Sequence, residues 1–250
     1  MLRGVIFDLG STLIRYTGEE QDTLAHMRAD LSGYLLAAGL PFEPDAFLTT
    51  FAVKLDEFYT QRLHDWVEVT AAFVLRQTLG ALGLPPPTDG LIEGALKAYF
   101  AYSEARWQPM PDAHATLERL AGEGYRLGLI SNAGDDGNVQ RLIDNAGLRR
   151  WLDPILVSAA VGLRKPNPRI FRMALEAWGL PAQEVAMVGD TLGADILGAQ
   201  LSGLRSVWIA SRSDTPANQA HDGNIRPEAT IDSLAELHEA LSIFGGIRNV

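Results

Sequence analysis

The chain has 250 residues, no cysteine and a formal net charge of -10, from 31 acidic and 21 basic side chains. The absence of cysteine excludes disulfide bonds, thiolate zinc sites and a cysteine nucleophile. The negative charge disfavours attraction to nucleic acid or to an anionic membrane, so we expect neither as a partner. The N-terminus shows no secretory pattern, and no apolar run is long enough to span a bilayer. We therefore expect a complete, cytoplasmic protein.

The first element is a short apolar run, GVIFD at residues 4–8, which predicts a buried strand. Helical periodicity then extends from residue 15 to residue 108. It falls into about four segments, because turn-forming sequences interrupt it at LPFEP (40–44) and LPPPTDG (84–90). An all-helical insert is therefore expected after the first strand.

From residue 109 onward, strands and helices alternate. Further apolar runs predict strands at 126–131, 154–158, 185–190 and 205–210. Helical patterns between them cover 112–124, 138–148, 168–180 and 193–204. Short, nearly all-apolar strands are typical of a parallel sheet that helices cover on both faces. The polar segment 211–229 is expected to be a surface loop before a short terminal strand and helix.

The predicted fold class is thus α/β, with a Rossmann-like doubly wound parallel sheet as the core and a smaller all-helical domain. We expect the core domain to comprise residues 1–14 and 109–250 and the helical insert to comprise residues 15–108. The number of subunits cannot be deduced from these patterns.

Reactive side chains follow several of the predicted strands. Asp8, Ser131 and Asp190 each stand at the carboxyl end of a strand, and the loop after 154–158 brings Lys165 to the same edge. In an open α/β sheet, ligands bind outside this edge. Carboxylates are suitable ligands for Mg²⁺, while a hydroxyl and an ammonium can bind phosphate oxygens. The sequence therefore predicts a site for magnesium and a phosphate group.

The residues at these strand ends belong to four ordered motifs: VIFDLGSTLI (5–14), LGLISNAG (127–134), GLRKPNPRIF (162–171) and VGDTLGADILGA (188–199). In this order they resemble the haloacid dehalogenase (HAD)-like hydrolase superfamily, in its phosphatase branch with a helical cap after the first motif. The resemblance covers essentially the whole chain. It implies that the helical insert is a cap over the active site.

The resemblance also implies roles for the residues of the first two motifs. Asp8 takes the place of the nucleophile, and Thr12 that of the catalytic threonine. Ser131 takes the place of the phosphate-binding hydroxyl, with Asn132 beside it in substrate binding. The implied reaction is phosphoryl transfer from a small phosphorylated metabolite to Asp8, followed by hydrolysis of the aspartyl phosphate.

The third and fourth motifs imply the remaining groups of the site. Lys165 is expected to bind substrate and to stabilise charge on the transferring phosphoryl group. Mg²⁺ is expected on Asp8, on the main-chain carbonyl of Gly10 and on Asp190, with Asp195 as a supporting acid. The cap is expected to open for substrate and to close against bulk water.

Gly10 departs from the family pattern, because phosphatases of the superfamily usually carry a second aspartate there as general acid and base. The carbonyl contact to the metal survives this change, whereas a proton transfer that typically contributes about 10²- to 10⁴-fold to the rate is lost. We favour a substrate with a good leaving group, such as an acyl, aryl or anomeric phosphate, or a proton donor from the cap or the substrate. A long-lived aspartyl phosphate and a non-catalytic binding protein are the alternatives.

Two further enzyme classes of the superfamily are alternatives to a phosphatase. A haloacid dehalogenase needs neither a proton donor nor a metal, but the Gly189–Asp190 pair does not fit that branch. A phosphonatase would need a cap lysine, and Lys54 and Lys97 both lie in patterns typical of solvated helix faces. Some residues near or in the cap must face the substrate, and the candidates are Arg15, Tyr16, Arg62, His64 and Trp66, although each taken singly is expected to have no role in the site.

Overall fold

The computed structural model describes residues 1–210, 213–221 and 223–245, except for the side chains of residues 62–64. Its core is a six-stranded parallel sheet in the order β5-β4-β1-β6-β7-β8. The strands are β1 (Gly4–Phe7), β4 (Arg126–Ser131), β5 (Ile155–Val157), β6 (Val185–Gly189), β7 (Arg205–Ile209) and β8 (Ala229–Ile231). The predicted α/β class is therefore confirmed.

The central strand β1 is paired on both sides. Gly4 is in register with Arg126 of β4 and with Val185 of β6. Later strands extend the sheet outward from β4 on one side and from β6 on the other, so the strand order reverses about β1. The carboxyl end of β1 therefore lies at a topological switch point, where α/β sheets bind ligands.

Helices cover both faces of this sheet. The side chains of Val5 and Phe7 pack on one face with α5, α6 and α11, whereas Ile6 packs on the other face with α8 and α9. The helices of the core are α5 (Ala113–Gly122), α6 (Asp136–Asn145), α7 (Ser158–Val161), α8 (Pro168–Trp178), α9 (Leu197–Ser202), α10 (Pro216–Gln219) and α11 (Leu237–Ser242). Short 3₁₀ turns are η1 (Arg149–Trp151), η2 (Ala182–Glu184) and η5 (Leu234–Glu236). Burial on both faces explains why these strands are almost wholly apolar.

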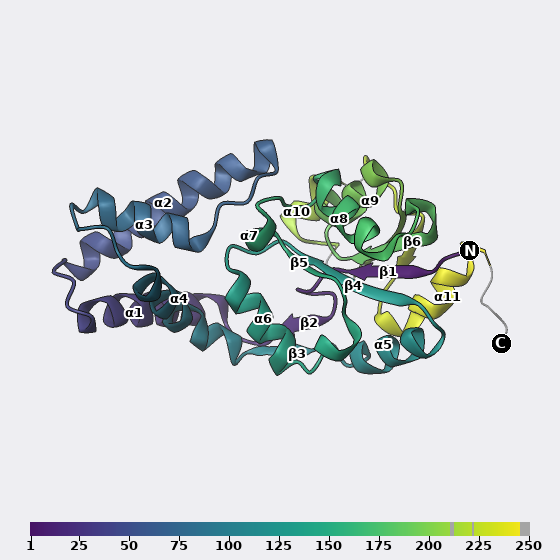
Figure 1. The fold of residues 1–250 in the computed structure, drawn as a ribbon, viewed down its shortest axis with the longest axis horizontal. Helices are drawn as coiled ribbons and strands as arrows, with labels where there is room; N and C mark the ends of the chain where they lie inside the picture. Colours follow the sequence, from purple (N-terminus) through teal and green to yellow (C-terminus); the bar gives the residue numbers. More distant parts are fainter. Residues whose placement is uncertain (211–212, 222, 246–250) are drawn as a thin grey trace.

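The helical insert consists of α1 (Glu20–Ala37), α2 (Pro44–Asp65), α3 (Ala71–Ala81) and α4 (Asp89–Glu104). It has an apolar core of its own, which includes Leu35, Phe51, Leu75 and Leu96. In Figure 1 these helices lie to the left of the sheet, while the N-terminus and α11 lie at the right. We call this insert the cap. Among the described residues, no helix combines the length and apolar composition needed to cross a membrane.

Two local features differ from the sequence expectation. The chain enters and leaves the cap through a small antiparallel ribbon, β2 (Ile14–Tyr16) with β3 (Trp107–Pro109), which was not predicted. The helix expected at 193–204 divides into a π-helical turn, η3 (Leu192–Ile196), and α9. Such π-turns occur often at functional sites because they redirect side chains within a helix.

Candidate active site

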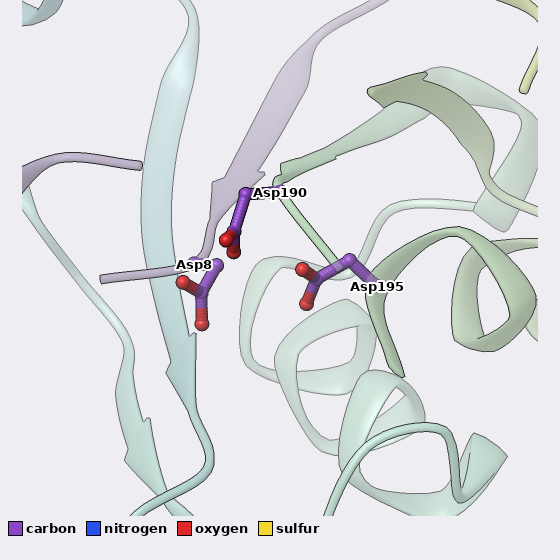
Figure 2. A group of neighbouring side chains, drawn as sticks. All are labelled: Asp8, Asp190 and Asp195. Carbon is purple, nitrogen blue, oxygen red and sulfur yellow. The ribbon is translucent and has the colours of Figure 1, made fainter. Parts of the chain in front are cut away.

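Three aspartates gather at the carboxyl edge of the sheet. Asp8 directly follows β1, Asp190 directly follows β6, and η3 supplies Asp195. One carboxylate oxygen from each lies within 4.8 Å of the others. Figure 2 shows the three side chains turned toward a common space. The structure therefore brings the predicted nucleophile, metal ligand and supporting acid together.

Asp195 reaches this position because Gly189 has no side chain. A Cβ at Gly189 would lie 2.3 Å from the Asp195 carboxyl carbon, a distance that no side chain tolerates. The Asp195 carboxylate is almost fully buried and accepts a hydrogen bond of 3.0 Å from the Thr191 N–H. The π-turn and the glycine thus hold the Asp195 carboxylate close to the other two.

Lys165 is the cation that faces this cluster. Its Nζ lies 2.6 Å from Asp8 Oδ1 and 2.8 Å from Asp195 Oδ1, and it donates to the Ile130 carbonyl at 2.6 Å. Burial alone would lower the pKa of Lys165, but Asp195 and Asp8 outweigh it and raise that pKa above its usual value. Lys165 therefore stays protonated.

The pKa of Asp8 is also raised, but here burial is the dominant cause. Burial, which outweighs the attraction of Lys165, raises the pKa of Asp8 to about 7, and the charges of Asp195 and Asp190 add to that rise. Three carboxylates around one ammonium leave an excess of negative charge. A divalent cation would neutralise this excess, and carboxylate oxygens are the ligands that Mg²⁺ prefers. The residues present therefore fit a metal site.

Of the other predicted site residues with a side chain, two line the cavity and one is buried outside its lining. Ser131 and Asn132 line the cavity next to Lys165. The Asn132 side chain also holds the Lys165 backbone, since it donates to the carbonyl at 2.9 Å and accepts from the N–H at 2.8 Å. Thr12 is fully buried, lies outside the described cavity lining, and its hydroxyl finds no hydrogen-bond partner among the described residues.

Gly10 faces the cavity beside the nucleophile. A Cβ at this position would meet only the Trp107 indole, at 3.7 and 3.9 Å, which is ordinary van der Waals contact. Its φ lies outside the left-handed region, whereas the next residue, Ser11, has a φ of 61°. Nothing in the local structure therefore requires glycine at position 10.

Asn218 and Trp208 support the site, although no sequence pattern selects them. The Asn218 amide and the Trp208 indole N–H each donate to the Asp190 carbonyl at 2.9 Å. The Asn218 side chain also accepts from the Leu192 N–H at 2.8 Å. Asn218 is 2% exposed, so the expectation of a surface loop over 211–229 is wrong at α10. Residues 211, 212 and 222 of that segment lie outside the described part of the chain.

A cavity of about 480 Å³ opens over the aspartates. Its polar wall includes the cluster described above, Ser131 and Arg164, and its apolar wall includes Ile14, Trp107, Val139 and Leu142. The suggested substrate-facing residues Arg15, Tyr16 and Trp66 are not in the described lining. The side chains of Arg62 and His64 lie outside the described residues.

Comparison with known proteins agrees with the geometry. A family model described as haloacid dehalogenase-like hydrolase matches residues 2–203. A glyceraldehyde 3-phosphate phosphatase from Methanothermobacter thermautotrophicus is 30% identical over 243 residues, which cover 96% of this chain and all of that enzyme. A phosphoserine phosphatase from Thermus thermophilus is 38% identical over 143 residues, and this match spans about half of each chain, 56% here and 55% there.

The fold also resembles that of solved structures. A 2-haloacid dehalogenase from Pseudomonas syringae superimposes with a TM-score of 0.70 at 26% identity, over 98% of this chain and 100% of that one. The predicted superfamily is thus confirmed by a sequence model, by curated relatives and by a structure. The chain belongs to the haloacid dehalogenase-like hydrolase family.

Proposed function

We propose that this protein is a Mg²⁺-dependent phosphatase that acts on a small phosphorylated metabolite, with Asp8 as its nucleophile. The observation that carries the proposal is the convergence of Asp8, Asp190 and Asp195 beside Lys165 at the switch point of the sheet. The phosphatases among the relatives, named for glyceraldehyde 3-phosphate and phosphoserine, support a small phosphate ester as substrate.

In the proposed reaction, a carboxylate oxygen of Asp8 attacks phosphorus. The new oxygen–phosphorus bond forms as the bond to the leaving oxygen breaks, and the leaving group takes the electron pair. Water then attacks the aspartyl phosphate, releases inorganic phosphate and restores the Asp8 carboxylate. Lys165 stabilises charge on the phosphoryl oxygens. Asp8, the Gly10 carbonyl and Asp190 would hold Mg²⁺, which would supply the positive charge that offsets repulsion between carboxylate and phosphate.

The cavity offers no evident substitute for the acid missing at position 10. Among the described lining residues, those with ionisable side chains are Asp8, Asp190, Asp195, Arg164 and Lys165. The first is the nucleophile, and the next two are assigned to the metal and to Lys165. Arg164 and Lys165 are held by Glu68 and by Asp8 and Asp195, and the raised pKa of Lys165 makes it a poor proton donor. In this proposal the leaving group departs without a proton from these residues. We infer that acyl, aryl and anomeric phosphates are turned over faster than alkyl phosphates.

The test is release of inorganic phosphate from acetyl phosphate, phenyl phosphate, a sugar 1-phosphate and an alkyl phosphate, each with and without Mg²⁺. Activity that requires Mg²⁺ and disappears in Asp8→Asn is the expected result. Absence of turnover on every ester in the set would contradict the proposal and favour a ligand-binding protein on the same fold.

Dehalogenation is the second candidate, because the superimposed Pseudomonas syringae structure is a 2-haloacid dehalogenase. A halide also leaves without a proton, so Gly10 is compatible with this chemistry. The excess negative charge around Lys165 opposes dehalogenation, because a 2-haloacid is itself an anion. In a reaction without a metal ion, no added cation would offset the repulsion between this substrate and the carboxylates. Halide release from a 2-haloacid in the absence of divalent cations would favour this candidate over the phosphatase.

A further inference from the structure

A segment of the cap, residues 66–70 between α2 and α3, lies directly on the core. Val67 and Leu163 form an antiparallel bridge. On either side of it, the Arg164 N–H donates to the Trp66 carbonyl at 3.1 Å, and the Glu68 N–H donates to the Gly162 carbonyl at 3.1 Å. We call residues 66–70 the docking segment. Its contact with the core is made by main-chain hydrogen bonds, so its register is fixed.

The docking segment carries a buried carboxylate into the core. The Glu68 side chain is 0% exposed, although the neighbouring Val67 is 45% exposed. Ser158, at the start of α7, donates to Glu68 Oε2 at 2.6 Å, and Arg164 Nη1 lies 3.6 Å from Oε1. The Val69 N–H also donates to Oε1, at 3.1 Å. A buried carboxylate is tolerated only with such partners, so its place in the core depends on them.

Both core partners of Glu68 are next to catalytic groups. Arg164 lines the cavity and immediately precedes Lys165. The Ser158 hydroxyl accepts a hydrogen bond of 2.9 Å from the N–H of Ala133, which follows the Ser131–Asn132 pair. One cap side chain therefore contacts the loop that carries Lys165 directly, and it reaches the turn after Ser131 and Asn132 through Ser158.

We propose that Glu68 is a positioning residue, through which docking of the cap sets the geometry of the catalytic cavity. It holds the Arg164 guanidinium at the cavity wall and, through Ser158, holds the turn at Ala133. When the docking segment leaves the core, Glu68 and Arg164 return to water and both restraints are released together. The closed cap and the ordered phosphate pocket are thus one state of the molecule.

This inference rests on the proposed function for its kinetic test but has a second readout that needs no substrate. The variants are Glu68→Gln, which keeps the size of the side chain and removes the charge, and Glu68→Ala. Glu43→Gln is the matched control, because Glu43 is an exposed cap glutamate whose side chain makes no hydrogen bond or ion pair with the described residues of the core. Thermal unfolding of each variant identifies any global loss of structure.

The kinetic measurement is kcat/KM for acetyl phosphate and for phenyl phosphate at saturating Mg²⁺. Hydrogen bonds to a charged group typically contribute enough for roughly a tenfold effect or more. We expect kcat/KM to fall about tenfold in Glu68→Gln and further in Glu68→Ala, by the same factor for both substrates, because Glu68 contacts Arg164 and Ser158 and not the substrate. The control stays at the wild-type value. An unchanged kcat/KM in Glu68→Ala, or a loss confined to one ester, would overturn the positioning role.

The second readout is residue-resolved amide hydrogen exchange without substrate. In Glu68→Ala, the amides of Arg164 and Ala133 should exchange at least about tenfold faster. The amide of Leu129, bonded to the Pro154 carbonyl inside the sheet, should keep its wild-type rate. If Arg164 and Ala133 stay protected, the proposal is wrong whatever the activity shows. If they lose protection while wild-type protein hydrolyses no phosphate ester, the proposed function fails and the link from cap to cavity stands.

Discussion

The Gly10→Asp variant is expected to accelerate the hydrolysis of alkyl phosphates selectively. The position accepts a side chain, since the nearest atoms to a new Cβ are those of the Trp107 indole at 3.7 Å. An aspartic acid there would face the cavity beside Asp8 and could protonate a leaving alkoxide. Such a general acid typically contributes at least about 100-fold, or ~2.7 kcal/mol of activation free energy.

The assay compares phosphate release from an alkyl, an aryl and an acyl phosphate at saturating Mg²⁺. We expect a gain of about 100-fold for the alkyl ester and little change for acetyl phosphate, whose leaving carboxylate needs no proton. Gly10→Asn is the control, because it has nearly the same shape and no acidic proton. An equal gain on all three esters, or an equal gain from asparagine, would refute the leaving-group reasoning.

Three other variants address the metal site and its supports. Without divalent cations, Asp8→Asn should stabilise the fold by up to about 4 kcal/mol above pH 7, because a pKa raised to about 7 makes ionised Asp8 unfavourable there. This gain in stability should shrink as the pH falls from 7 toward 4. Thermal unfolding across this pH range measures it. Asn218→Ala should weaken Mg²⁺ binding by about tenfold in calorimetry, while Gln219→Ala, on the exposed side of the same helix, should not; equal effects would contradict the supporting role. Gly189→Ala should lower stability by about 1–3 kcal/mol and reduce activity, since its methyl group would displace Asp195; a variant with wild-type melting temperature and rate would show that this close approach is unimportant.

Much of the fold follows from short-range sequence patterns. The apolar runs that end at Asp8 and Asp190 predict strands because a doubly covered parallel strand must be apolar along its whole length. Both acids then meet at one edge, since parallel strands share their carboxyl ends. Such patterns do not predict the ribbon of β2 and β3, because each strand is three residues long and β3 has the sequence Trp-Gln-Pro. Too few residues are present for an alternating pattern to emerge.

The supports of the site depend on contacts between distant residues. Asn218 lies in a polar stretch that resembles a loop, and its importance arises from the Asp190 carbonyl 28 residues earlier. Glu68 lies 90 residues before its partner Ser158 and has no local signal that distinguishes it from a solvated acid. Single-sequence patterns identify groups that act at strand ends, whereas residues that hold those groups become visible only when the chain is folded.

The measurement that tests the central claim most directly is the capture of the phosphorylated enzyme. Protein mixed with acetyl phosphate and Mg²⁺ is quenched in acid and digested, and mass spectrometry locates any phosphoryl group. The expected result is one phosphoryl group on Asp8, present in wild type and absent both in Asp8→Asn and without Mg²⁺. Phosphate release with no modified Asp8 at any quench time, or a phosphoryl group on another residue, would contradict Asp8 as the nucleophile.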